Sequence, residues 1–230
     1  MVKKFGLIES KMYLQITTKC NMTCEHCCFA CGAKGDTMTI KTAEKALKLA
    51  REYVMTLTIG GGEPTLHPQF FEILGLSLSY CCDDIRPHVI TNGKVKERAL
   101  RLGQMGRAGI LSVELSQTDF HDPISDEVLA FYKRRIGNTG VREIQSDRII
   151  ATGRAEDWGQ TQGCACTAVR ITPTGTMHFC GCLEAPVLGN VHDKNAGEIL
   201  EKIMEDRPDY EADCFKELEI NKTMAEEEVA

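Results

Sequence analysis

Residues 12–27 read MYLQITTKCNMTCEHC and hold the features that decide the fold. Apolar and polar side chains alternate through residues 12–18, which is the period of a half-buried β-strand. Cys20, Cys24 and Cys27 follow at once, with the spacing Cys-x3-Cys-x2-Cys, on the loop that leaves this strand. A loop this short can bring three thiolates around one metal centre and leave one coordination position open. Both a catalytic zinc site and a cubane iron–sulfur cluster fit that description.

Downstream of the cysteines, helix-like and strand-like patterns alternate. We predict helices over residues 40–54, 68–80, 95–105 and 126–135, and strands over residues 56–60, 88–93, 110–116, 141–145 and 148–152. Strands that alternate with helices favour a parallel sheet with crossover connections. The predicted strand–helix units are too few to close an eight-stranded barrel of about 250 residues. We therefore expect an α/β fold, a partial (β/α)6 TIM-like barrel.

The pattern changes near residue 160. Residues 163–172 and 176–182 predict two antiparallel strands joined by a turn at residues 173–175. We therefore divide the chain into a partial barrel over residues 1–158 and an extension over residues 159–230. The extension holds this β-hairpin, a C-terminal helix and an acidic tail.

The composition excludes several classes of protein. The chain has 230 residues, of which 43% are hydrophobic and 26% charged, so it can bury a core. Its net charge of −6 disfavours a uniformly basic nucleic-acid-binding face. No apolar run approaches the roughly 18 residues of a membrane span. The twelve cysteines follow no signal-peptide pattern, so we expect a cytoplasmic protein whose clustered thiols bind a metal or a cluster.

A second motif, GGEP at residues 61–64, ends the strand over residues 56–60. Together with the three cysteines it resembles the radical S-adenosylmethionine (SAM) superfamily, from about residue 12 to at least residue 153. The resemblance implies that the three cysteines hold a [4Fe–4S] cluster whose fourth iron binds SAM. It also implies reductive cleavage of SAM to a 5′-deoxyadenosyl radical that abstracts hydrogen from a substrate, with flavodoxin or ferredoxin as the reductant.

The resemblance assigns SAM contacts to residues at the strand ends. Gly61 and Gly62 lack a Cβ, which lets the backbone approach the ligand, and Glu63 helps to fix the methionine amino group. His26 takes the position at which the family usually has an aromatic residue beside the adenine, with an ordinary loop histidine as the alternative. Asn92 is expected at the ribose hydroxyls, and a turn-forming Asn-Gly pair is the competing interpretation.

On the strand over residues 110–116, alternation places Glu114 and Ser116 on the face opposite the leucines and the valine. We expect this polar face to line the barrel lumen, and the resemblance assigns SAM contacts to Glu114 and Ser116. Solvent-facing polarity is the alternative, since the sequence departs here from the serine-leucine-aspartate run of many relatives. Arg142 and Arg154 are candidates for binding a carboxylate.

Four further cysteines flank the predicted hairpin: Cys164, Cys166, Cys180 and Cys182. If the hairpin keeps its register, all four thiols share one face. Their spacing resembles the auxiliary-cluster hairpin of radical SAM proteins with a shortened SPASM or twitch extension. This predicts a second Fe–S cluster, with zinc or no metal as alternatives. Cys214 could replace one ligand, donate a hydrogen atom or do neither, and Cys28 and Cys31 are interpreted as spare buried thiols.

The substrate class follows from the same resemblance. A peptide or protein is favoured, because the twitch-like group is rich in enzymes that modify peptides. Few residues precede the first strand, so a separate peptide-recognition protein is then expected. The alternative is a radical dehydrogenase or rearrangement enzyme that acts on a small molecule such as a sugar, an aminocyclitol or a nucleoside. A non-catalytic Fe–S or zinc-binding protein is disfavoured, because it has no need of the glycine-glutamate motif.

Overall fold

One eight-stranded sheet organises the chain. The computed structural model describes residues 11–53, 56–80, 86–142, 149–159 and 168–206. The strands are β1 (Lys11–Thr17), β2 (Thr56–Gly61), β3 (His88–Thr91), β4 (Ser112–Ser116), β5 (Thr139–Arg142), β6 (Ala168–Ile171), β7 (Thr176–His178) and β8 (Val187–Asn190). Their order across the sheet is β5-β4-β3-β2-β1-β6-β7-β8.

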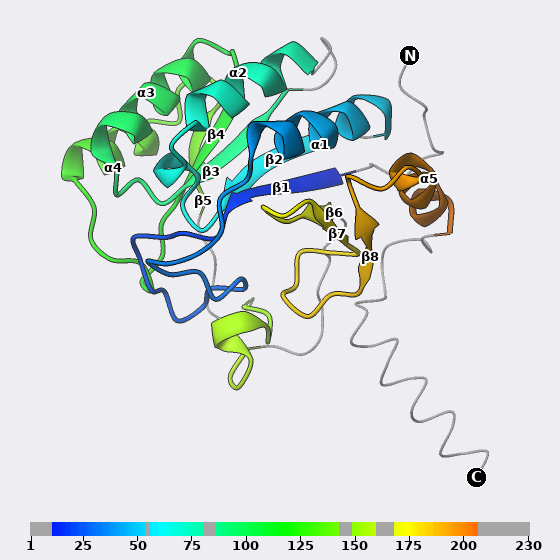
Figure 1. Cartoon of the computed structure of the whole chain (residues 1–230). Helices are drawn as coiled ribbons and strands as arrows, with labels where there is room; N and C mark the ends of the chain where they lie inside the picture. The colour runs from blue at the N-terminus through cyan, green and yellow to red at the C-terminus, as the bar shows by residue number, and fades with distance from the viewer. Residues whose placement is uncertain (1–10, 54–55, 81–85, 143–148, 160–167, 207–230) are drawn as a thin grey trace.

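The helices cover one face of this sheet. They are α1 (Ile40–Tyr53), α2 (Phe70–Tyr80), α3 (Lys96–Arg107), α4 (Asp126–Lys133) and α5 (Ala196–Asp206). The described residues also form the 3-10 turns η1 (Pro64–Leu66) and η3 (Gly153–Ala155). Helices α1 to α4 form one layer beside the parallel strands, and α5 packs against α1 and β8 (Figure 1). None of the helices in the described ranges is both long and apolar enough to cross a membrane.

Strands β1 to β5 are parallel, and β1, β2, β3 and β4 each pair with the strand that follows along the chain. A helix follows each of β1 to β4, so the carboxyl ends of all five strands meet at the same edge. This confirms the expected α/β partial barrel. In folds of this kind the strand carboxyl ends carry the functional residues.

The core lies between the parallel strands and the helix layer. Leu14, Ile59 and Val113 are fully buried on the strands, and Leu47 and Leu102 are buried on the helices that face them. Burial of such side chains stabilises the fold by about 25 cal/mol per Å² of apolar surface. On β4 the valine and leucine are buried while the polar residues between them are half-buried, which confirms the predicted alternation.

Strands β6 and β7 form the predicted antiparallel hairpin, whose turn is closed by a 2.9 Å hydrogen bond from the Gly175 N–H to the Thr172 carbonyl oxygen. Strand β6 also pairs in parallel with β1, so the hairpin continues the main sheet. The returning strand ends at His178, although we predicted it to continue to residue 182. The chain bends there because Arg170 donates to the Cys182 carbonyl oxygen at 3.0 Å, which satisfies that group outside a strand ladder.

A second difference concerns the strand predicted over residues 148–152. Residues 149–152 form no strand, and only Ile150 makes an isolated bridge. The Thr152 hydroxyl instead donates to a Glu184 carboxylate oxygen at 2.7 Å, and Gly153 turns the chain with a φ of +61°. The predicted strand over residues 141–145 is observed in part, as β5, and residues 143–145 lie outside the described ranges.

Candidate active site

A pocket opens at the carboxyl ends of the parallel strands, with a cavity volume of about 580 Å³. This size suits a small-molecule ligand. The predicted site residues that line it are Cys20, Cys24, His26, Cys27, Gly61, Gly62, Asn92, Glu114 and Ser116. The fold therefore brings together residues from the loop after β1 and from the ends of β2, β3 and β4.

Residues 18–39, called the cysteine loop below, fold against the ends of β1 and β2. The Cys20 N–H donates to the Gly32 carbonyl oxygen at 2.6 Å, which closes the loop at its base. A Cβ on Gly62 would overlap the Lys19 carbonyl oxygen and lie 3.0 Å from the Cβ of Cys20. Glycine at position 62 therefore allows the two sequence motifs to touch.

Arg154 holds the cysteine loop from the other side. Its Nε donates to the Cys24 carbonyl oxygen, and its Nη1 and Nη2 both donate to the Cys31 carbonyl oxygen, each at 2.8 Å. Figure 1 shows the η3 turn, which carries this arginine, beside the blue cysteine loop. In this structure Arg154 is therefore engaged with the loop backbone, and it does not face the pocket as a carboxylate-binding residue.

The thiols of the loop lie in different electrostatic environments. Burial raises the pKa of Cys20 to about 11 and also raises that of Cys24. A hydrogen bond with the Cys31 thiol lowers the pKa of Cys27 to about 6. In the ranges that the structure describes, no three Cys, His, Asp or Glu side chains have the spacing of a bare metal-ion site.

Glu63 is fully buried beneath the pocket. Its carboxylate accepts hydrogen bonds from the Thr65 N–H at 3.1 Å, the Thr65 hydroxyl at 2.6 Å, the Thr91 hydroxyl at 2.8 Å and the Asn92 N–H at 2.7 Å. Burial raises the pKa of Glu63, and these hydrogen bonds oppose the rise. The carboxylate thus joins the end of β2 to the end of β3. Its predicted contact with the methionine amino group stays a prediction.

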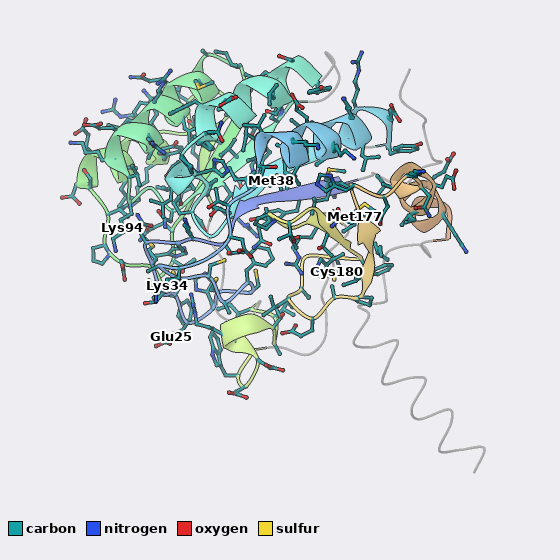
Figure 2. All side chains as sticks on the ribbon, in the orientation of Figure 1. Glu25, Lys34, Met38, Lys94, Met177 and Cys180 are labelled. Carbon is teal, nitrogen blue, oxygen red and sulfur yellow. The ribbon has the colours of Figure 1, made fainter. Side chains whose placement is uncertain are left out.

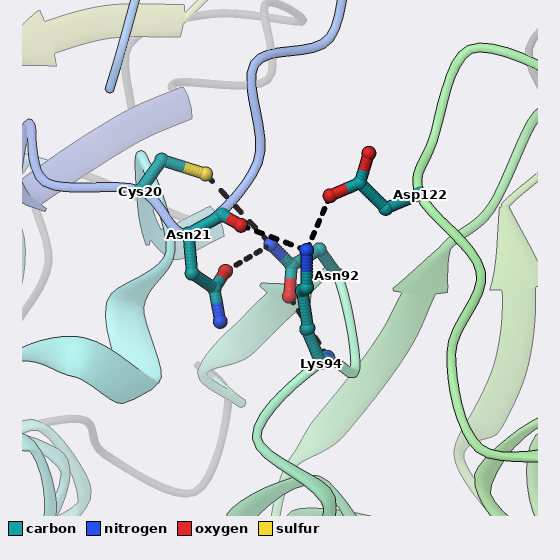
Figure 3. A network of polar contacts seen from close by, with 5 residues as sticks. All are labelled: Cys20, Asn21, Asn92, Lys94 and Asp122. Atoms are coloured by element: carbon teal, nitrogen blue, oxygen red, sulfur yellow. Dashed lines mark hydrogen bonds and ion pairs between the residues drawn. The ribbon is translucent and has the colours of Figure 1, made fainter. Parts of the chain in front are cut away.

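A polar network that sequence reasoning missed joins Asn92 to the cysteine loop (Figure 3). The Asn92 Nδ2 donates to the Asn21 Oδ1 at 2.9 Å and lies 3.7 Å from the Cys20 sulfur. Lys94 donates to the Asn21 carbonyl oxygen at 3.0 Å and forms an ion pair with Asp122. The network thus positions Cys20 from the end of β3. The only sequence signals were the polar neighbours of two motifs, Asn21 after a cysteine and Lys94 after an Asn-Gly pair.

The wall formed by β3, β4 and β5 carries charge. The His88 Nε2 lies 3.4 Å from a Glu114 carboxylate oxygen, and this hydrogen bond holds the pKa of Glu114 below its usual range. Ser116 and Arg142, at the ends of β4 and β5, line the same wall. His88 was also missed, because alternation on β3 gives it no distinguishing feature.

Aromatic rings surround His26. Its ring centroid lies 5.2 Å from that of Phe120 and 4.9 Å from that of His121, and Phe120 stacks on Trp158 at 5.6 Å. Burial lowers the pKa of His26 and lowers that of His121 to about 4, which disfavours the charged form of both imidazoles. The Nδ1 atom of His26 is buried without a hydrogen-bond partner in the part of the chain that the structure describes. A planar ring with an unused polar atom suits the side of a nucleobase.

The sequence profile of the radical SAM superfamily matches residues 14–146, which is more than half of the chain. The chain belongs to the radical SAM superfamily. The family implies a [4Fe–4S] cluster and SAM as its cofactors. The donor set fits that cluster, because three thiols of one short loop line an open pocket.

Curated relatives of this radical SAM protein match over a short stretch. The mycofactocin maturase MftC of Mycobacterium ulcerans is 32% identical over 68 residues, which are 29% of this chain and 18% of the relative. MftC of Mycobacterium tuberculosis matches at the same identity over 17% of its length. The matched stretch thus spans less than a fifth of these relatives.

Solved structures match over most of the chain. BtrN in complex with AdoMet and 2-DOIA has a TM-score of 0.65 at 17% identity, covering 92% of this chain and 89% of BtrN. The enzyme anSMEcpe with bound AdoMet and the Kp18Cys peptide has a TM-score of 0.58 at 14% identity, covering 86% and 82%. These likenesses confirm the partial-barrel fold of this radical SAM protein.

The second group of cysteines is described in part. Cys164 and Cys166 lie outside the described ranges, as does Cys214. Cys180 and Cys182 lie in the bend after β7, where Figure 2 labels Cys180. Each is 4% exposed, and Cys182 also lines the pocket of the radical SAM site. Convergence of all four thiols stays a prediction.

Proposed function

We propose that this radical SAM enzyme modifies a peptide or protein substrate. The observation that carries the proposal is an aromatic pair beside the SAM pocket. Trp158 is 43% exposed and stacks on Phe120, which in turn contacts His26 of the pocket lining. An apolar surface that continues into an active site suits a substrate with side chains. The similarity to a protein called a maturase and to the peptide complex of anSMEcpe supports this choice.

In the proposed site, Cys20, Cys24 and Cys27 hold the [4Fe–4S] cluster. The bound cluster and SAM supply the electron transfer that yields a 5′-deoxyadenosyl radical, which abstracts hydrogen from the substrate. Gly61 and Gly62 let the backbone approach the methionine end of SAM. The carboxylate of Glu63 already accepts four hydrogen bonds. In this proposal Glu63 therefore helps to fix the methionine end of SAM indirectly, by holding the ends of β2 and β3 together.

The remaining SAM contacts are assigned along the pocket wall. His26 lies beside the adenine, where its ring and the buried Nδ1 atom are available. Asn92, Glu114 and Ser116 contact the ribose or the methionine carboxylate. Arg142 lines the same wall and, among the described residues, forms no ion pair. We assign its guanidinium to a carboxylate of SAM or of the substrate.

Residues 159–230 form, in this proposal, a shortened twitch-like extension on the barrel of residues 1–158. Cys164, Cys166, Cys180 and Cys182 bind a second Fe–S cluster there. Cys180 and Cys182 are both buried, and Cys182 lines the SAM pocket, which supports the assignment. Zinc is the alternative metal.

The proposed setting is the cytoplasm, where flavodoxin or ferredoxin supplies electrons. A separate peptide-recognition protein is the proposed partner for substrate delivery. Both suggestions follow from the proposed substrate and from thiols that require a reducing compartment.

A small-molecule substrate is the second candidate. The contact between His88 and Glu114 and the guanidinium of Arg142 give the β3–β5 wall a polar character. A sugar-like or nucleoside-like molecule would use such groups. The similar fold of BtrN, solved with 2-DOIA, supports this candidate.

One experiment separates the two candidates. The reconstituted enzyme is incubated with SAM and a strong reductant, together with a short peptide encoded beside its gene or with 2-DOIA. The proposal predicts that the peptide alone changes in mass and raises 5′-deoxyadenosine formation above the substrate-free rate. If only 2-DOIA raises 5′-deoxyadenosine formation and changes in mass, the second candidate is favoured.

A further inference from the structure

Arg170 is a cation in the interior of the protein. It lies on β6 and is only 3% exposed. Its Nη1 donates to the Gln15 Oε1 at 3.2 Å, and its Nη2 donates to the carbonyl oxygens of Cys182 and Leu183 at 3.0 and 3.3 Å. Its Nε has no hydrogen-bond partner in the ranges that the structure describes.

This guanidinium also has no carboxylate partner among the described residues. A buried charge without a counter-charge is costly, and proteins rarely keep one. Burial lowers the pKa of Arg170, and the ionisable groups that act to raise it are Cys28, Cys180, Cys182 and Tyr13. The surroundings of this cation are therefore rich in thiols.

The register of the sheet explains how Arg170 reaches these thiols. Strand β6 pairs in parallel with β1, with Tyr13 opposite Arg170. The guanidinium carbon lies 5.3 Å from the ring centroid of Phe29, whose ring also packs 5.4 Å from that of Tyr13. Phe29 belongs to the cysteine loop, and Cys182 belongs to the bend after β7. The guanidinium thus lies between the loop of the SAM cluster and the second pair of cysteines.

Gln15 extends this arrangement toward the first cluster. It is 1% exposed, and its Nε2 lies 4.0 Å from the Cys31 sulfur while its Oε1 accepts from Arg170. Cys31 in turn hydrogen-bonds Cys27. A continuous line of buried polar groups therefore runs from the cysteine loop through β1 and β6 to the carbonyl oxygen of Cys182.

We infer that Arg170 is the counter-charge of an anionic metal–thiolate centre held in part by Cys180 and Cys182, and that it raises the reduction potential of that centre. Thiolate ligands give an Fe–S cluster negative charge, and reduction by one electron adds more. A fixed cation in a low-dielectric interior stabilises the more negative, reduced state. Arg170 is thus a positioning residue that acts through the cluster, and the inference rests on the proposed second cluster.

The test uses the full chain with Cys20→Ala, Cys24→Ala and Cys27→Ala, so that only the second centre contributes to the spectra. The protein is reconstituted with iron and sulfide, its metals are measured, and its midpoint potential is obtained by a redox titration followed by electron paramagnetic resonance. Arg170→Met removes the charge at similar volume, and Arg170→Lys keeps the charge. Arg101→Met is the matched control, since Arg101 stacks on Phe71 in the helix layer.

We expect Arg170→Met to shift the midpoint potential to more negative values. The parent in this comparison is the Cys20→Ala, Cys24→Ala, Cys27→Ala protein. The midpoint potential of Arg170→Lys should stay close to that of the parent, and the midpoint potential of Arg101→Met should equal it. Equal potentials for the parent and Arg170→Met would overturn the inference. If Arg170→Met binds no iron, restored binding in Arg170→Lys supports the role of charge, whereas loss in both variants overturns it.

A parent that binds zinc or no metal would overturn the inference together with the second cluster. The proposed SAM chemistry is measured separately, as 5′-deoxyadenosine formed by the chain with all cysteines intact. Failure of the Arg170 inference is therefore distinguishable from failure of the proposed function.

Discussion

The Oε2 atom of Glu63 accepts a hydrogen bond of 2.7 Å from the backbone N–H of Asn92. This bond joins the end of β2 to the end of β3 directly beneath the pocket. Because the side chain of Asn92 also approaches the Cys20 sulfur, we expect a change at Glu63 to affect a proposed cluster ligand. Glu63 thus connects the two sequence motifs through the strand ends.

Replacing Glu63 by glutamine should destabilise the protein before any cofactor is bound. The new amide N–H₂ group would face donors of Thr65, Thr91 or Asn92, which leaves buried groups unsatisfied and costs about 2 kcal/mol of the free energy of unfolding. Urea unfolding of the metal-free protein measures this cost. Glu114→Gln is the control, because its half-exposed carboxylate should contribute less than about 1 kcal/mol. Unchanged stability of Glu63→Gln with weakened SAM binding would instead assign Glu63 a direct ligand contact.

Gly62→Ala should prevent assembly of the SAM cluster. Its Cβ would overlap the Lys19 carbonyl oxygen and press on Cys20, so we expect a large loss of bound iron and of SAM cleavage. Gly75→Ala in α2 is the matched control, because its Cβ would meet no atom within 4 Å. The control should gain up to about 1 kcal/mol of stability from better helix propensity. Iron content and thermal melting measure both variants, and full iron in Gly62→Ala would refute the close approach.

Arg154→Met should weaken the cysteine loop without removing a ligand. Three hydrogen bonds of 2.8 Å to the carbonyl oxygens of Cys24 and Cys31 would be lost. Removing a residue that supports the ligands of a metal centre typically lowers metal affinity or activity by about 10–100-fold. We expect the rate of SAM cleavage to fall by a factor of that size. The exposed Arg134, replaced by methionine, serves as the control. Equal rates for both variants would show that the loop holds its shape without Arg154.

Cys31→Ala should keep the SAM cluster, and Cys27→Ala should lose it. The two thiols form a hydrogen bond, so proximity alone does not say which one is the ligand. The family spacing assigns Cys27, and Cys31 is 3% exposed behind it. Iron content and SAM cleavage after reconstitution decide between them. If Cys27→Ala still cleaves SAM and Cys31→Ala does not, Cys31 is the cluster ligand and Cys27 is not.

Local sequence patterns predicted most of the fold, since they record which face of an element is buried. The stripe of α1 includes Ala43, Leu47 and Ala50, all buried, and the alternation of β4 is equally regular. The bend after His178 and the irregular residues 149–152 were predicted wrongly as strands. Their conformations depend on side-chain hydrogen bonds from other elements, which no local period records.

The sequence likewise predicted the parts of the site that lie in local motifs and missed the contacts between distant residues. The spacing of two motifs predicted a site at the cysteines 20, 24 and 27 and the glycines 61 and 62, and the fold places all five at one pocket. The role of Arg154 was not found, because its partner Cys24 is 130 positions away and contributes a backbone carbonyl oxygen, which every residue has. Arg170 was missed for a related reason. The role inferred for Arg170 depends on its burial and on the thiols near it. Neither can be predicted without knowing that β6 pairs with β1.

The central claim is that Cys20, Cys24 and Cys27 hold the cluster that cleaves SAM. The most direct measurement is 5′-deoxyadenosine formation by anaerobically reconstituted protein under a strong reductant, comparing the parent with the Cys20→Ala, Cys24→Ala, Cys27→Ala variant. We predict 5′-deoxyadenosine from the parent and none from the variant, with a loss of roughly four iron atoms per chain. Cleavage that persists in the variant at the parent's rate would contradict the account.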